Sequence, residues 1–147
     1  MVRNKLFSSM EVVKFVMGGN AYFTIVNPIT SVRFTYRVSR KENEDGTKSP
    51  YFVSVLTGPD NWSNYRYLGV MFEDGTFRYG KKSKISRDAT SAKAITWFLN
   101  SLTKEDVQTQ VDRIEFWHEG RCCVCGRKLT VPESIESGIG PVCGGRI

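Results

Sequence analysis

The stretch Ser31 to Arg40, SVRFTYRVSR, alternates apolar and polar residues over most of its length. The apolar positions are Val32, Phe34, Tyr36 and Val38. Successive side chains of a β-strand point to opposite faces, so this alternation predicts a half-buried strand. Arg33 and Arg37 fall on the other face, which is therefore expected to be basic.

Similar patterns flank this stretch on both sides. Extended segments are expected at 21–27 and 51–57, a hairpin at 65–80 around Asp74-Gly75, and a last strand at 111–118. Helical spacing of apolar residues predicts helices over 8–19 and 88–102, and 103–110 could add one more helical turn. Because the strands follow one another through short turns, we expect an α+β fold with a mostly antiparallel sheet and two helices.

The C-terminal stretch holds the only histidine and all four cysteines of the chain. Cys122 and Cys125 have the spacing of a zinc knuckle, and His118 and Cys143 would complete a tetrahedral Cys3His set. We therefore predict one structural Zn²⁺ and a division into an α+β core at 1–111 and a small zinc-binding module at 112–147. A redox pair, a disulfide and a catalytic metal are weaker alternatives, and Cys123 is either a spare thiol or a replacement ligand for Cys122.

The motif CxxCGRxLTxPxSxxxGIGPxC, from Cys122 to Cys143, resembles a zinc-finger-like domain of unknown function found in phage and bacterial proteins. Upstream segments such as GNAYFTIVN and YFVSVLTGPDN resemble the longer members of that family. The resemblance implies a bound zinc ion, a phage origin and a role connected with nucleic acid. Cys123 departs from the pattern, because another residue type is usual at that position.

The net charge of +6 is concentrated in two segments. Residues 1–40 carry six basic and one acidic residue, and residues 61–87 carry six basic and two acidic residues. Two basic segments separated by an acidic loop favour a surface for a polyanion. The candidate nucleic-acid-binding residues are Arg33, Arg37, Trp62, Arg66, Arg78, Lys81, Lys82, Lys84, Arg87, Arg121, Arg127 and Lys128.

Simple alternation along the predicted hairpin puts Arg66 and Arg78 on the basic face with Arg33 and Arg37. The aromatic residues between them are then expected on the opposite face, in the core. They are Tyr65, Tyr67, Phe77 and Tyr79.

These patterns predict a zinc-containing protein that binds single-stranded or duplex DNA. No nucleophile motif, phosphate loop or second histidine is present, so we expect no catalytic activity. The alternative is a protein-directed regulator that binds and inhibits or recruits a host polymerase or defence complex. No apolar run is long enough to span a membrane, and a cytoplasmic location is expected.

Overall fold

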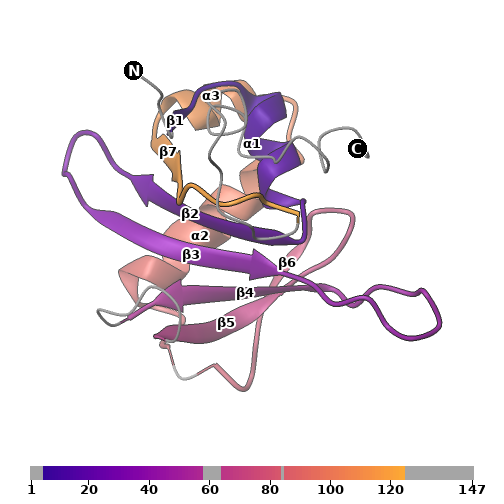
Figure 1. Ribbon diagram of the computed structural model, residues 1–147. Coiled ribbons are helices and arrows are strands. Elements are labelled where there is room, and N and C mark those ends of the chain that lie inside the picture. Colours follow the sequence, from indigo (N-terminus) through magenta and orange to yellow (C-terminus); the bar gives the residue numbers. More distant parts are fainter. Residues whose placement is uncertain (1–4, 58–63, 84, 125–147) are drawn as a thin grey trace.

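The computed structural model describes residues 5–57, 64–83 and 85–124. Over these residues the chain forms one antiparallel sheet of seven strands (Figure 1). The strands are β1 (Lys5–Leu6), β2 (Asn20–Val26), β3 (Arg33–Ser39), β4 (Tyr51–Leu56), β5 (Tyr65–Met71), β6 (Phe77–Tyr79) and β7 (Glu115–His118). The helices are α1 (Ser9–Val16), α2 (Thr90–Ser101) and α3 (Val107–Asp112).

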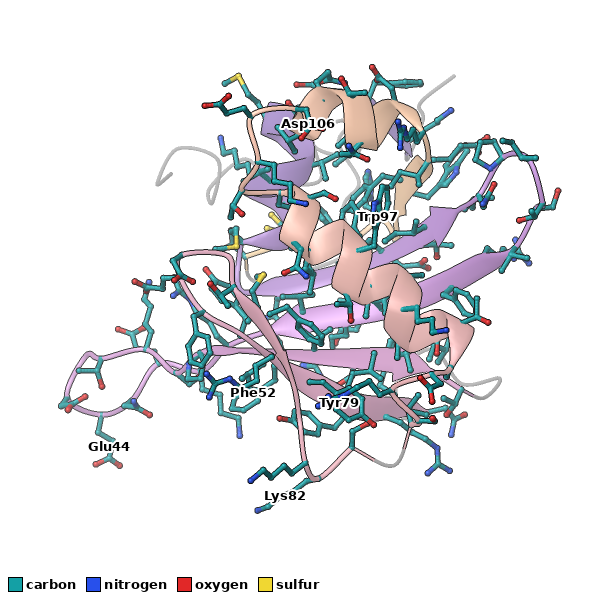
Figure 2. The ribbon with its side chains drawn as sticks, turned by 180° about the vertical axis from the view of Figure 1, so that it is seen from behind. Glu44, Phe52, Tyr79, Lys82, Trp97 and Asp106 are labelled. Carbon is teal, nitrogen blue, oxygen red and sulfur yellow. The ribbon has the colours of Figure 1, made fainter. Side chains whose placement is uncertain are left out.

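The strand order is β1-β7-β2-β3-β4-β5-β6. Strands β2 to β6 follow the chain through hairpins, whereas β7 returns from the end of the described chain to lie between β1 and β2. The connection between β3 and β4 projects away from the sheet, and Glu44 lies at its far end (Figures 1 and 2).

The helices pack on one face of the sheet. Figure 1 shows α2 behind the strands, and Figure 2, drawn from the other side, shows it crossing in front of them. Aromatic rings join the layers: Phe116 stacks on Phe23 at 4.8 Å and on Phe98 of α2 at 5.7 Å. Phe15 of α1 meets Phe116 edge-on at 5.7 Å. The hydrophobic core therefore lies between the helices and this face.

The expected fold class is wrong in two respects. Over the described ranges there is a third helix, α3, and the fold is sheet-rich, with one sheet that includes β7 from the segment assigned to a zinc module. Among the described residues no group of three or more histidine, cysteine or acidic side chains could hold a metal ion. The inclusion of β7 in the sheet has a local cause. Phe116 and His118 are buried and alternate with more exposed neighbours, so residues 115–118 pair as a strand. The domain boundary expected between residues 111 and 112 stays a prediction.

Candidate nucleic-acid interface

The face of the sheet opposite the helices, here called the open face, carries a row of register partners. Tyr22 of β2 pairs with Arg37 of β3, Arg37 pairs with Ser54 of β4, and Ser54 pairs with Tyr67 of β5. Directly opposed residues in antiparallel strands share a face. The row therefore places two tyrosines and an arginine on one side of the sheet.

A β-bulge decides which residues of β5 belong to the open face. Val53 pairs with Gly69, but the next residue, Ser54, pairs with Tyr67, so Leu68 is an extra residue in β5. A bulge of this kind reverses the alternation of side chains on one strand. Leu68 is fully buried, and Tyr65 and Tyr67 consequently lie on the open face.

The expected positions of the hairpin residues are therefore partly wrong. Arg78 pairs with Val70 and lies on the open face as predicted. Arg66 pairs with the buried Val55 and lies on the helix side, exposed at the sheet edge. Tyr65 and Tyr67 lie on the open face with Arg37, whereas Phe77 and Tyr79 keep the predicted core-facing side. A glycine at 69 inside a strand was the sequence signal for the bulge.

Arg37, Tyr22 and Tyr65 form a compact cluster on the open face, in which Tyr22 is only 9% exposed and serves to position its neighbours. The guanidinium carbon of Arg37 lies 5.2 Å from the centroid of the Tyr22 ring, a cation–π distance. Tyr22 meets Tyr65 edge-on, with ring centroids 5.8 Å apart. Arg37 Nε and Tyr65 Oη are buried and have no hydrogen-bond partner among the described residues. Such polar atoms are costly to leave unpaired, so both call for a partner that the described residues do not supply.

The phenol of Tyr65 stays protonated far into the alkaline range. Burial is the largest cause that raises the pKa of Tyr65, to about 12, and the charge of Glu119 and the neighbouring Tyr22 raise it further, while Arg37 lowers it. The hydroxyl of Tyr65 is therefore a neutral donor at physiological pH.

The ring of Tyr67 lies close over the backbone of Gly80, the residue after β6. A Cβ atom at position 80 would come within 2.6 Å of Tyr67 Cε2 and 2.7 Å of its hydroxyl oxygen. Only a glycine leaves room for the ring in this position. Tyr67 is half-buried there, with part of its surface accessible from the open face.

A polar pocket of about 510 Å³ opens beside the Arg37 cluster. Its lining includes Arg33, Thr35, Thr24 and Glu119. The hydroxyl of Thr24 donates to Glu119 Oε1 at 2.8 Å and lies 2.6 Å from the Thr35 hydroxyl. Since Thr24 has one hydroxyl proton, Thr35 is the donor of the second bond. The lining of the pocket therefore contains both a cation and an oriented carboxylate.

The two sides of the sheet differ modestly in net charge. Segments 9–16 and 88–113, which contain the helices, carry four basic and five acidic residues. The open face carries Arg33, Arg37 and Arg78, and Lys5 of β1, which pairs with Trp117. The acidic residues near this face are Glu115 and Glu119. Arg66 and Arg87 also lie on the helix side and bring its count to six basic and five acidic residues, against four and two on the open face, so the open face is modestly the more basic of the two.

The other predicted residues are scattered. Lys81 and Lys82 are exposed in the turn after β6, and Arg87 lies over the Tyr79 ring at 4.9 Å, on the helix side. Arg121 is half-buried. Trp62, Lys84, Arg127 and Lys128 lie outside the described residues. Sequence reasoning missed Tyr22, although its alternation with Ala21 and Phe23 could have identified it.

Two of the four predicted metal ligands are described. His118, at the end of β7, is 2% exposed, and Cys122 is fully buried. The backbone N–H of Val124 donates to Cys122 Sγ at 3.5 Å. Gly120 N–H donates to His118 Nδ1 at 3.0 Å. Zinc at this ring would break that bond, by taking Nδ1 or by moving the ring proton there. Cys125 and Cys143 lie outside the described residues.

Cys123 is fully buried and packs against the connection between α1 and β2. A Cβ atom at Gly18 would lie 2.7 Å from Cys123 Sγ, and Asn20 N–H donates to the Cys123 carbonyl at 2.7 Å. These contacts fit a packing role for Cys123, beside the connection between α1 and β2.

Comparison with known proteins assigns only the end of the chain. Residues 115–147 match a family of unknown function (DUF6011), which agrees with the resemblance to a domain of unknown function. The matched segment begins with β7, the strand between β1 and β2. No curated protein and no solved structure matches the chain. Within the described residues, every helix is too short or too polar to cross a membrane.

Proposed function

We propose that the protein binds single-stranded nucleic acid, most readily DNA, along the open face of its sheet. The observation that carries this proposal is that the bulge in β5 adds the half-buried Tyr67 to the row that contains Arg37, whose guanidinium lies over the buried ring of Tyr22. Proteins that hold single strands combine aromatic rings, on which bases stack, with cations that neutralise phosphates. Both kinds of side chain lie together on this face.

Aromatic surface on this face extends beyond that row. Phe52 of β4 is 37% exposed and shares a register row with Val70 and Arg78. Trp117 of β7 pairs with Lys5, whose ammonium nitrogen lies 5.9 Å from the tryptophan ring centroid. Stacking needs bases whose flat faces are accessible, so a broad sheet face with several rings suits an unpaired strand better than a duplex.

The rest of the proposal concerns zinc, origin and location. We propose that His118, Cys122, Cys125 and Cys143 bind one structural Zn²⁺, supported by the sequence spacing and by the hydrogen bond from Val124 to Cys122 Sγ. A phage-encoded protein acting in the host cytoplasm, without catalytic activity, is part of the same proposal. Elemental analysis of protein purified without added metal is expected to give one zinc per chain. Folded protein without zinc would contradict this part alone.

Fluorescence titration tests the nucleic-acid proposal. A labelled single-stranded oligonucleotide is titrated with protein at low and at high salt, and a duplex of the same sequence serves as the comparison. We expect binding of the single strand at low salt and a steep loss of affinity as salt rises, because phosphate contacts release counterions. Absence of binding at low salt would refute the proposal.

A protein-directed regulator is the second candidate, and one observation favours it. An apolar groove of about 870 Å³ runs between the β2–β3 hairpin and helix α2. Ile29, 92% exposed, and Trp97, 39% exposed, contribute to its lining. Pull-down from host lysate with and without nuclease separates the candidates. A specific host protein that survives nuclease treatment and is lost with Ile29→Asp would favour the regulator.

A further inference from the structure

The carboxylate of Glu119 is out of place on a surface for phosphates. It lies directly after β7 on the open face, in the wall of the polar pocket that also contains Arg33. A carboxylate repels phosphate, so a purely phosphate-binding groove would be better without it. Its role on this face is therefore to be sought in contacts with hydrogen-bond donors.

The carboxylate of Glu119 is held in one orientation by a chain of hydroxyl groups. Thr35 donates to Thr24, and Thr24 donates to Glu119 Oε1 at 2.8 Å. Each carboxylate oxygen accepts up to two hydrogen bonds, so most of the accepting capacity of Glu119 is left for other donors. The side chain is exposed, and its charge contributes to the raised pKa of Tyr65, whose main cause is burial. The carboxylate thus stands close to the aromatic cluster.

We propose that Glu119 gives this face a preference for guanine, with the carboxylate accepting hydrogen bonds from the Watson–Crick edge of one unpaired base. This inference rests on the proposed binding of single strands. Guanine presents two adjacent donors on that edge, N1–H and the exocyclic amino group, which match the two oxygens of a carboxylate. Adenine and cytosine present an amino group beside a ring acceptor, and thymine presents one N–H between two carbonyls, so each brings an acceptor against the carboxylate.

The pocket accommodates the other parts of such a nucleotide. Arg33, which also lines the pocket, is exposed and can contact the phosphate. Its volume of about 510 Å³ lies within the range of small-molecule sites. Guanine in a single strand and a free guanine nucleotide share this chemistry.

The test uses the full chain and a short thymidine oligonucleotide with one central base varied. Affinities are measured for guanine, adenine, cytosine, thymine and hypoxanthine at that position, the last lacking the exocyclic amino group. We expect guanine to bind about tenfold more tightly than thymine, with hypoxanthine in between, because a good bidentate base contact is worth about that factor. Competition by GMP, compared with TMP, reports whether the free nucleotide uses the same pocket.

The Glu119→Gln variant tests the residue itself. Its amide group brings a donor against the guanine donors and removes the charge, so we expect the guanine preference to disappear while thymidine oligonucleotides bind equally well or better. Glu105→Gln, which removes a charge on the helix side, is the matched control and should keep the preference. Thr24→Val removes the hydroxyl that orients the carboxylate and should weaken the preference without changing the charge.

The outcomes separate this inference from the function on which it rests. If no oligonucleotide binds to the wild-type protein, the proposed function fails. If oligonucleotides bind without a base preference, or if Glu119→Gln keeps the guanine preference, binding stands and the role of Glu119 is refuted.

Discussion

Arg37 lies over the ring of Tyr22, with its guanidinium carbon 5.2 Å from the ring centroid, on a face of the sheet that no described helix covers. The ring holds the planar guanidinium in place, and the Nε atom of Arg37 has no hydrogen-bond partner among the described residues. An arginine fixed in this way is ready to bind an anion without first losing its own rotational freedom.

The first prediction concerns the shape of this cation. Arg37→Lys keeps the charge but loses the planar fork and its contact with Tyr22, so we expect weaker binding of single strands, by about threefold to tenfold. The slope of affinity against salt should change little, because the charge remains. Arg40→Lys is the matched control, since Arg40 lies 4.5 Å from the Tyr51 ring centroid but pairs with Glu73. Equal effects of both substitutions on binding would contradict a special role for Arg37.

A second prediction uses the close contact between Gly80 and Tyr67. In Gly80→Ala the added methyl group would overlap the far end of the Tyr67 ring, which has to swing away from the sheet. Because a flexible side chain can move, we expect a loss of stability of only about 1 kcal/mol. We expect the affinity for the oligonucleotide to fall in Gly80→Ala, and also in Tyr67→Ala, by more than the small loss of stability would cause. Unchanged affinity in both variants would show that Tyr67 does not contact the oligonucleotide.

Alkaline stability provides a third prediction. The pKa of Tyr65 is raised to about 12 in the folded protein, mainly by burial, above the ordinary tyrosine value of 10.0. The folded state therefore retains a proton that the unfolded state loses, and this contribution to stability is full below pH 10 and lost as pH rises through about 12. The free energy of unfolding, measured by chemical denaturation at several alkaline pH values, should fall less steeply with pH for Tyr65→Phe than for the wild type.

The Tyr65→Phe variant also tests the buried hydroxyl. At neutral pH it should be as stable as the wild type or more so, because it removes a buried polar atom that has no partner among the described residues. A clear loss of stability at neutral pH would show that the hydroxyl is satisfied in solution.

The fourth prediction concerns the attachment of β7. Phe116 is 1% exposed and contacts Phe23, Phe98 and Phe15, from the sheet and two helices. Phe116→Ala should lower the free energy of unfolding by about 3–5 kcal/mol, the usual cost for a large core aromatic. Far-ultraviolet circular dichroism and tryptophan fluorescence should report one shared transition. A small effect, or two separate transitions, would indicate that 112–147 folds apart from the sheet.

Much of the sheet could be predicted from local pattern. Alternation identified β3, and the Asp74-Gly75 turn identified the β5–β6 hairpin, because both signals depend on neighbouring residues. The position of β7 between β1 and β2 depends on contacts between residues 89 to 112 positions apart, which no local pattern reports. Strand β1 has only two residues, too few to show alternation.

The candidate interface was harder to predict than the sheet. The open-face positions of Arg33, Arg37 and Arg78 followed from alternation, which holds while strands are regular. One extra residue, Leu68, exchanged the faces of Arg66 and the two flanking tyrosines. The feature that decides which side chains lie on the open face is therefore the β-bulge in β5, and Gly69 was its only signal in the sequence.

The most direct measurement compares two charge removals from opposite sides of the sheet by salt-dependent fluorescence titration with a single-stranded oligonucleotide. One variant combines Arg33→Ala with Arg78→Ala on the open face, and the other combines Lys93→Ala with Lys104→Ala on the helix side, all exposed residues. We predict that the open-face variant binds at least tenfold more weakly and that its salt slope becomes shallower by about 1.4, the value for two phosphate contacts to a single strand, whereas the helix-side variant stays close to wild type. Equal losses in both variants, or none in the open-face variant, would contradict an interface on the open face.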